Sequence, residues 1–204
     1  MTFTKRSAAP DLPTIERRTM AIETVELRAD GSGDLTFRGY ASVTEHAYDV
    51  AGGPPYGFTE TIARGAFAKT LAENPDVVFL INHDGLPLAR TASGTLRLDE
   101  DNTGLRVEAD LNPEDRDVQW ILPKLERGDL TEMSFAFRVM RQEWDEDYID
   151  RRITEVSLNR GDVSVVRFGA NPATSGDIER HAEPPTPTPG VWSLDYARSV
   201  AAAS

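Results

Sequence analysis

The stretch DVVFLINHDGLPLART, residues 76–91, contains the strongest local signal for the fold. It begins with the uninterrupted apolar run 77–81, which is typical of a buried β-strand. Asn82, His83 and Asp84 follow directly, and a glycine and a proline-containing turn come next. The sequence therefore predicts a strand that ends in a polar, titratable group.

Alternating and continuous apolar runs elsewhere predict a chain dominated by strands. We predict an α+β domain, mainly an antiparallel, barrel-like β-sheet of about seven strands wrapped by two or more helices. Pro123 is expected to kink or interrupt the second helix. The expected strands cover residues 22–29, 35–43, 76–82, 94–111 (a hairpin), 132–140, 151–158 and 162–168, and the helices cover 59–74 and 112–129.

Composition restricts the chemistry. None of the 204 residues is a cysteine, which excludes disulfides, thiolate metal sites and cysteine nucleophiles. The net charge of −12 argues against nucleic acid and anionic membranes as partners, because those ligands favour a basic surface. No apolar run approaches the ~20 residues of a membrane span, so we expect an intracellular protein.

Three segments are expected along the chain. Residues 1–20 are interpreted as a flexible arm, and residues 21–176 as the folded domain. Residues 177–204 contain four prolines within six positions, 184–189, which predicts an extended or disordered tail.

Ser134 is a candidate nucleophile. In the expected strand around it, Met133 and Phe135 point to an apolar face, whereas Ser134 and Ala136 form a small opposite face that a substrate could approach. The pattern fits equally an ordinary polar residue on a half-exposed strand, and spacing alone leaves both interpretations open.

His83 is a candidate general base. It shares strand parity with Phe79 and Ile81, so the expected strand would hold its ring at a core-directed but open end. Imidazole exchanges a proton near neutral pH, which suits acid–base catalysis. An imidazole bonded to Asp84 at a loop start is the alternative. His46 and His181 are weaker candidates, and His181 lies beside the proline-rich tail.

Asp162 and Glu155 are candidate acids for holding the far side of a histidine ring, although either could be a solvated charge. A metal-dependent hydrolase using His83, Asp84 and His46 is a further alternative, but a metal site usually needs three or four well-placed ligands. Residue patterns alone predict no more than an α+β domain with a candidate Ser-His-acid site.

The order of segments resembles the prohead serine proteases of tailed bacteriophages. The most specific motifs are NHD (82–84) followed by PLART, MSFAF (133–137) after GDL, and DVSVV (162–166) leading into ANPAT. Matching stretches extend from about residue 37 to residue 174. The sequence departs from the common pattern at ARGAF (63–67) and GANP (169–172), neither of which touches the proposed chemistry.

The resemblance implies a serine endopeptidase in which His83 is the catalytic histidine and Ser134 the nucleophile. It also implies an assemblin-like fold, similar to that of the herpesvirus enzymes. Those enzymes use a second histidine as the third member. Since no histidine lies in the third segment here, we favour Asp162 over Glu155 for this role. No cofactor or metal is implied, and the oxyanion donors are expected in the loop around Gly169 and Ala170.

The resemblance further implies the substrates and the location. The expected partners are the major capsid protein with its scaffolding segment and the protease itself, by autocleavage, inside the immature prohead in the bacterial cytoplasm. The assemblin likeness suggests a homodimer. A catalytically inactive scaffold or capsid-binding barrel of the same fold is the alternative function.

Overall fold

The computed structural model describes residues 14–21, 26–29 and 35–167. Its two α-helices are α1 (Ala68–Ala72) and α2 (Arg116–Glu126), and residues Thr91–Ser93 form one turn of 3-10 helix. In chain order, the strands are β1 (Ile15–Ala21), β2 (Glu26–Ala29), β3 (Leu35–Val43), β4 (Ala47–Val50), β5 (Phe58–Ile62), β6 (Val78–Ile81), β7 (Asp84–Arg90), β8 (Leu96–Glu100), β9 (Gly104–Leu111), β10 (Glu132–Trp144), β11 (Asp150–Ser157) and β12 (Asp162–Val166).

These strands form two open sheets. The larger has the order β4-β5-β11-β10-β12-β6-β7, with β1 added to β10, and the smaller has the order β2-β3-β9-β8. Most pairings are antiparallel, but β5 pairs with β11, and β6 with β12, in parallel. The α+β class and the dominance of strands are confirmed. The barrel-like closure is not, because the strand paths of the described residues do not close.

The two sheets share one apolar core. Phe37 of β3 and Phe79 of β6 pack with ring centroids 4.9 Å apart, which joins the small sheet to the large one. Phe135 stacks on Phe137 within β10 and meets Phe67 edge-on, at 4.6 and 5.8 Å. All five rings are almost fully buried. β10, which carries the candidate nucleophile, is therefore anchored from its apolar face.

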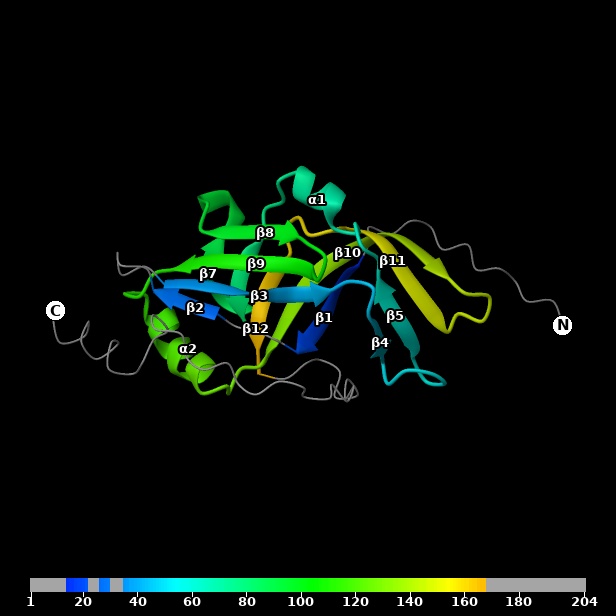
Figure 1. Ribbon diagram of the computed structural model, residues 1–204, viewed down its shortest axis with the longest axis horizontal. Coiled ribbons are helices and arrows are strands. Elements are labelled where there is room, and N and C mark those ends of the chain that lie inside the picture. The colour runs from blue at the N-terminus through cyan, green and yellow to red at the C-terminus, as the bar shows by residue number, and fades with distance from the viewer. Residues whose placement is uncertain (1–13, 22–25, 30–34, 168–204) are drawn as a thin grey trace.

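The helices lie at the periphery of the sheets (Figure 1). α2 begins at Asp115, whose carboxylate accepts a hydrogen bond from the amide of Asp117 at 2.8 Å, and buries Val118 and Ile121. It continues through Pro123, so the expected interruption there does not occur. None of the helices in the described part of the chain is long and apolar enough to cross a membrane.

The expected helix over 59–74 is mostly wrong. Residues 58–62 form β5 instead, and only residues 68–72 are helical. Thr59 and Thr61 carry β-branched side chains, which suit a strand, and the alternation buries Glu60 and Ile62. Gly65 has a positive φ of 84°, which separates the strand from the helix.

The N-terminal boundary also differs from the expectation. Residues 15–20 were expected in a flexible arm, but they belong to β1, which pairs along β10 from Ile15↔Arg138 to Ala21↔Glu132. β4 and β7 were not expected as strands either, and residues 84–90 of β7 were interpreted as a turn. The proline-rich tail, His181 and the Gly169–Ala170 loop lie outside the described residues.

Candidate active site

The central feature of the site is β12, which lies between the strand of Ser134 and the strand that leads to His83. Ser164 of β12 is the register partner of Ser134 on β10 and, on its other side, of Leu80 on β6. Because side chains alternate along a strand, Asp162 points to the same face as Ser164. β10 and β12, which are distant in sequence, thus present two hydroxyls and a carboxylate side by side.

His83 reaches this face from a tight turn. β6 ends at Ile81, which pairs with Asp84 of β7, and both residues between them have positive φ, 52° at Asn82 and 59° at His83. Such values at both central positions are those of a type I′ hairpin turn, and asparagine and histidine tolerate them better than most residues. The turn, rather than strand parity as expected from the sequence, sets the direction of the imidazole.

Asn82 fixes this turn to the end of β12. Its amide donates to the Val165 carbonyl at 2.9 Å, and its side-chain oxygen accepts from the Arg167 amide at 3.2 Å. The residue before His83 is therefore bonded to the end of the strand that also carries Asp162. This restricts ring movement without using either ring nitrogen.

The ring nitrogens bridge a hydroxyl and a carboxylate. His83 Nε2 lies 2.7 Å from Ser134 Oγ, and His83 Nδ1 lies 2.6 Å from Asp162 Oδ2. An ionised carboxylate only accepts, so Nδ1 carries the proton of a neutral ring and Nε2 accepts from the serine hydroxyl. This tautomer is the one that can take the serine proton.

Ser164 completes the cluster, and sequence reasoning did not assign it a role. Its hydroxyl donates to Asp162 Oδ2 at 2.6 Å, the same oxygen that accepts from His83. The available signal was strand parity with Asp162, two positions earlier. We refer to Ser134, His83, Asp162 and Ser164 as the Ser134 cluster.

Burial of this cluster is deep. Ser134 and Ser164 are fully buried, and the side chains of His83 and Asp162 are 16% and 10% exposed. Electrostatic interactions are stronger away from water, so each hydrogen bond here is electrostatically stronger than the same bond on the surface. The small face expected around Ser134 is present, but it is closed to solvent in this structure.

The other sequence candidates lie elsewhere. Glu155 pairs with Lys69 at 2.7 Å and Arg141 at 3.2 Å, and the hydrogen bond from Lys69 lowers the pKa of its carboxyl. His46 is exposed in the connection between β3 and β4. Asp84 is exposed at the start of β7. Among the residues that the structure describes, no three His, Asp or Glu side chains are grouped as a metal site requires.

A second buried polar cluster lies where β1 meets β5 and β11. Arg18 pairs with Glu60 through Nε at 2.6 Å and Nη2 at 2.9 Å, and Arg151 pairs with Glu16 at 2.8 and 2.9 Å. Arg151 also donates to Glu60 at 2.8 Å, and Tyr48 donates to the same carboxylate. We call these five residues the β1 ion cluster.

The pKa values in the β1 ion cluster follow from this pairing. Burial raises the pKa of the Glu16 carboxyl, but hydrogen bonds and charge from Arg151 and Arg18 outweigh it and leave that pKa below its ordinary value. Burial, together with the Glu60 carboxylate, raises the pKa of Tyr48 well above its ordinary value. Glu16 is thus held ionised and Tyr48 neutral.

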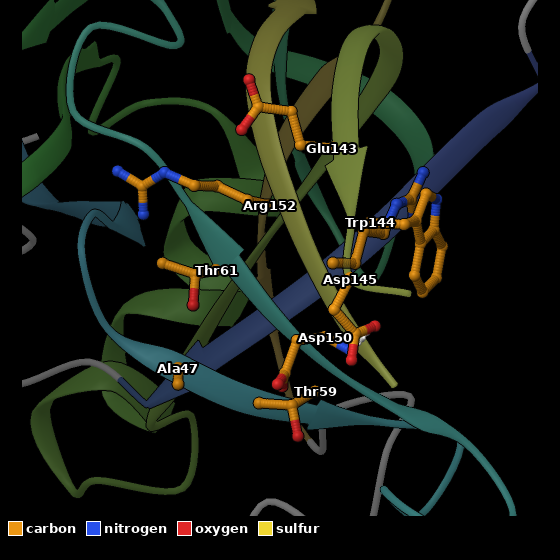
Figure 2. A pocket seen from close by; sticks show the side chains of 9 residues that line it. Ala47, Thr59, Thr61, Glu143, Trp144, Asp145, Asp150 and Arg152 are labelled. Atoms are coloured by element: carbon orange, nitrogen blue, oxygen red, sulfur yellow. Dashed lines mark hydrogen bonds between the residues drawn. The ribbon is translucent and has the colours of Figure 1, made fainter. Parts of the chain in front are cut away.

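A surface pocket lies apart from the Ser134 cluster. Its volume is about 360 Å³, and Figure 2 shows its charged lining between β5 and the β10–β11 hairpin. Three lining charges have structural partners: Asp145 accepts from the amides of Ile149 and Asp150, Arg152 pairs with Glu45, and Arg151 belongs to the β1 ion cluster. The lining residues are Ala47, Thr59, Thr61, Glu143, Trp144, Asp145, Asp150, Arg151 and Arg152.

Comparison with known proteins gives a family and a related structure. The chain resembles the solved structure of the bacteriophage T4 capsid assembly protease, gp21, with a TM-score of 0.52 and 12% identity over 76% of this chain and 98% of that one. At this identity the likeness concerns the fold alone. No curated protein matches the chain.

The family assignment comes from the sequence. The model of the caudovirus prohead serine proteases matches residues 23–186, a range that contains every member of the Ser134 cluster. The family model covers well over half of the chain, and the fold is similar to that of a capsid assembly protease. This chain therefore belongs to the prohead serine protease family of the tailed phages.

Proposed function

We propose that the chain is a serine endopeptidase in which Ser134 is the nucleophile, His83 the general base and Asp162 the third member. The observation that carries the proposal is the pair of distances at the imidazole, 2.7 Å to Ser134 Oγ and 2.6 Å to Asp162 Oδ2. Both lie within hydrogen-bond reach, as acyl transfer by a serine requires.

The proposed reaction follows from these positions. His83 Nε2 takes the proton of Ser134 while Oγ attacks a peptide carbonyl, and the ring becomes an imidazolium stabilised by Asp162. The tetrahedral intermediate collapses to an acyl-enzyme as the leaving amine takes the proton from Nε2. Water then attacks the acyl carbon while His83 takes its proton. The bond to Ser134 Oγ breaks, the carboxylate product leaves, and the proton returns to Oγ.

The substrates proposed are those that the family implies. They are the scaffolding segment of the major capsid protein and the chain itself, cleaved within the immature prohead in the host. The proline-rich tail at 177–204 is the expected site of autocleavage. Dimerisation, kinship with herpesvirus assemblin and the lack of nucleic-acid and membrane partners stay predictions.

Substitution of the nucleophile tests this function. Ser134→Ala is expected to abolish processing of co-expressed major capsid protein, and His83→Ala should match it because triad members act as a unit. Intact-mass analysis of the capsid protein is the measurement. Cleavage that continues in Ser134→Ala would contradict the assignment of the nucleophile. Absence of cleavage by the unsubstituted chain would favour the inactive-scaffold alternative.

Ser42→Ala is the matched control. Ser42 is also fully buried, but it lies on β3 of the small sheet, and its hydroxyl has no hydrogen-bond partner among the described residues. The same chemical change there removes an unsatisfied hydroxyl, so stability should be unchanged or improved, and processing should continue.

A further inference from the structure

β1 occupies the edge of the strand that carries Ser134. It pairs with residues 132–138 of β10, with Thr19 directly opposite Ser134. β12 takes the opposite edge over 132–135, and β11 pairs with β10 only from Arg138 onward. Within the described part of the chain β1 makes no second strand pairing. Without β1, a stretch of seven residues of β10 would be an open edge at the nucleophile.

β1 also lies outside the range that defines the family. The family model matches residues 23–186, whereas β1 ends at Ala21. Every residue of the Ser134 cluster and each of the other strands that flank them falls inside that range. β1 is thus attached beside the proposed catalytic residues rather than part of the matched protease sequence.

Two side chains of β1 hold it in place. Glu16 and Arg18 point to the face of β1 opposite to that of Thr19, because side chains alternate along the strand. Each forms a two-bond ion pair with the larger sheet, Arg18 with Glu60 and Glu16 with Arg151, at 2.6 to 2.9 Å. These charge-assisted bonds give the edge strand a specific register.

The surface that receives β1 is balanced in its absence. Arg151 donates to Glu60 at 2.8 Å and to Gln142 at 2.7 Å, and Tyr48 donates to Glu60. Acid and base on the receiving side therefore neutralise one another. If β1 left, no buried charge on the receiving side would remain unpaired. An unpaired buried charge is the main cost of breaking a buried ion pair.

We propose that the edge of β10 over residues 132–138 is a docking site for an extended peptide segment of a protein to be cleaved, and that β1 is its built-in competitor. An extended peptide adds to a free sheet edge through backbone hydrogen bonds, whatever its side chains. β1 uses that edge in this structure, and Ser134 is fully buried beside it. The link from docking to cleavage rests on the proposed role of Ser134.

The competition has a quantitative consequence. A peptide binds only the fraction of molecules in which β1 has left, so its apparent dissociation constant is the intrinsic one divided by that fraction. Weakening the ion pairs of β1 should therefore tighten peptide binding. Fixing β1 to β10 should prevent it.

A reversible crosslink tests the proposal in the full chain. Ile15 and Arg138 are register partners, and directly opposed Cα atoms in antiparallel strands lie about 4.5–5.5 Å apart, a distance that a disulfide spans. The Ile15→Cys/Arg138→Cys variant of this cysteine-free chain forms one defined crosslink. Its probe is a fluorescein-labelled synthetic peptide with the sequence of residues 14–21, TIERRTMA, followed by fluorescence anisotropy.

The expected result is at least tenfold weaker peptide binding when the crosslink is oxidised than when it is reduced. Arg18→Met, which removes one ion pair of β1, should bind the peptide at least tenfold more tightly than the unsubstituted chain. The Arg97→Cys/Glu108→Cys variant, a crosslink between register partners of β8 and β9, is the control and should bind equally in both states. Equal binding by oxidised and reduced Ile15→Cys/Arg138→Cys, with no gain in Arg18→Met, would overturn the proposal.

A second readout separates this proposal from the proposed function. A fluorophosphonate probe labels an activated serine, and its adduct at Ser134 is identified by mass spectrometry. Peptide binding that responds to the crosslink, without labelling of Ser134, would overturn the catalytic assignment and leave strand competition standing. Labelling of Ser134, together with peptide binding that is equal in the oxidised and reduced states, would support the catalytic assignment and overturn strand competition.

Discussion

Two buried polar clusters lie on opposite faces of the β1–β10 pair, and they are built differently. The β1 ion cluster holds two acids and two bases, each with an oppositely charged partner at 2.6 to 2.9 Å. The Ser134 cluster holds one carboxylate, one imidazole and two hydroxyls in a chain of hydrogen bonds. Compensated charge fixes position, whereas an uncompensated carboxylate beside a neutral ring favours proton transfer to that ring.

The largest expected effect concerns the carboxylate of the Ser134 cluster. Asp162→Asn should reduce the rate of Ser134 labelling by a fluorophosphonate on the order of 10⁴-fold, because an amide at Nδ1 favours the wrong tautomer of His83. Glu155→Gln, which changes the same group at the rejected position, should label at an unchanged rate. The opposite ranking would transfer the third role to Glu155.

The next effect concerns stability rather than rate. Arg151→Met should lower the free energy of unfolding by about 3–5 kcal/mol, because it leaves the fully buried Glu60 and the partly buried Glu16 with too little positive charge. Urea unfolding followed by tryptophan fluorescence measures this. Arg97→Met is the control: Arg97 is 47% exposed, and its pairs with Glu108 and Asp110 should contribute only about 0–1 kcal/mol. Equal losses in the two variants would remove the distinction between a compensated buried cluster and surface pairing.

A smaller effect is expected at Ser164, a positioning residue that acts through Asp162. Loss of a hydrogen bond to a charged group costs about 1.5–3 kcal/mol, so Ser164→Ala should slow fluorophosphonate labelling by about 10- to 100-fold. The maximal labelling rate should fall, while the probe's half-saturation concentration should stay unchanged. The acid limb of the pH–rate profile should shift along the pH axis. A slower rate with an unmoved pH profile would indicate a purely structural role.

The sequence predicted strands best where one face is buried and the other polar. The expected strand at 35–43 matches β3, and the hairpin expected around residues 101–104 matches the β8–β9 turn. In that turn Asp101 accepts from the amides of Thr103 and Gly104 at 2.7 and 3.2 Å. These are local signals, alternation and an Asx turn, which do not depend on distant residues.

Elements fixed by distant partners were missed. The sequence of residues 58–62 was interpreted as the start of a helix. In the structure Glu60 pairs with Arg18 and Arg151, which lie 42 and 91 positions away in the sequence. β1 has two adjacent arginines and no clear apolar alternation, so only its pairing with β10 identifies it as a strand. In β5 these partners act together with the strand preference of Thr59 and Thr61, and in β1 they supply what the local sequence lacks.

The candidate site was predicted unevenly. Strand patterns made His83 and Ser134 candidates, and the motif resemblance implied their roles. The structure places His83 between Ser134 and Asp162 and pairs Glu155 with Lys69. Ser164 and the left-handed turn at His83 were not foreseen. Neither a two-residue turn of Asn and His nor a hydroxyl shared between strands has a distinctive sequence pattern.

The central position of β12 has a consequence for when activity can arise. The strand that carries Ser134 and the strand before His83 pair with β12 rather than with each other. A nascent or truncated chain that stops before residue 162 lacks both the carboxylate and the strand that bridges the other two groups. Under the proposed function, such a chain could not carry out the chemistry assigned to Ser134.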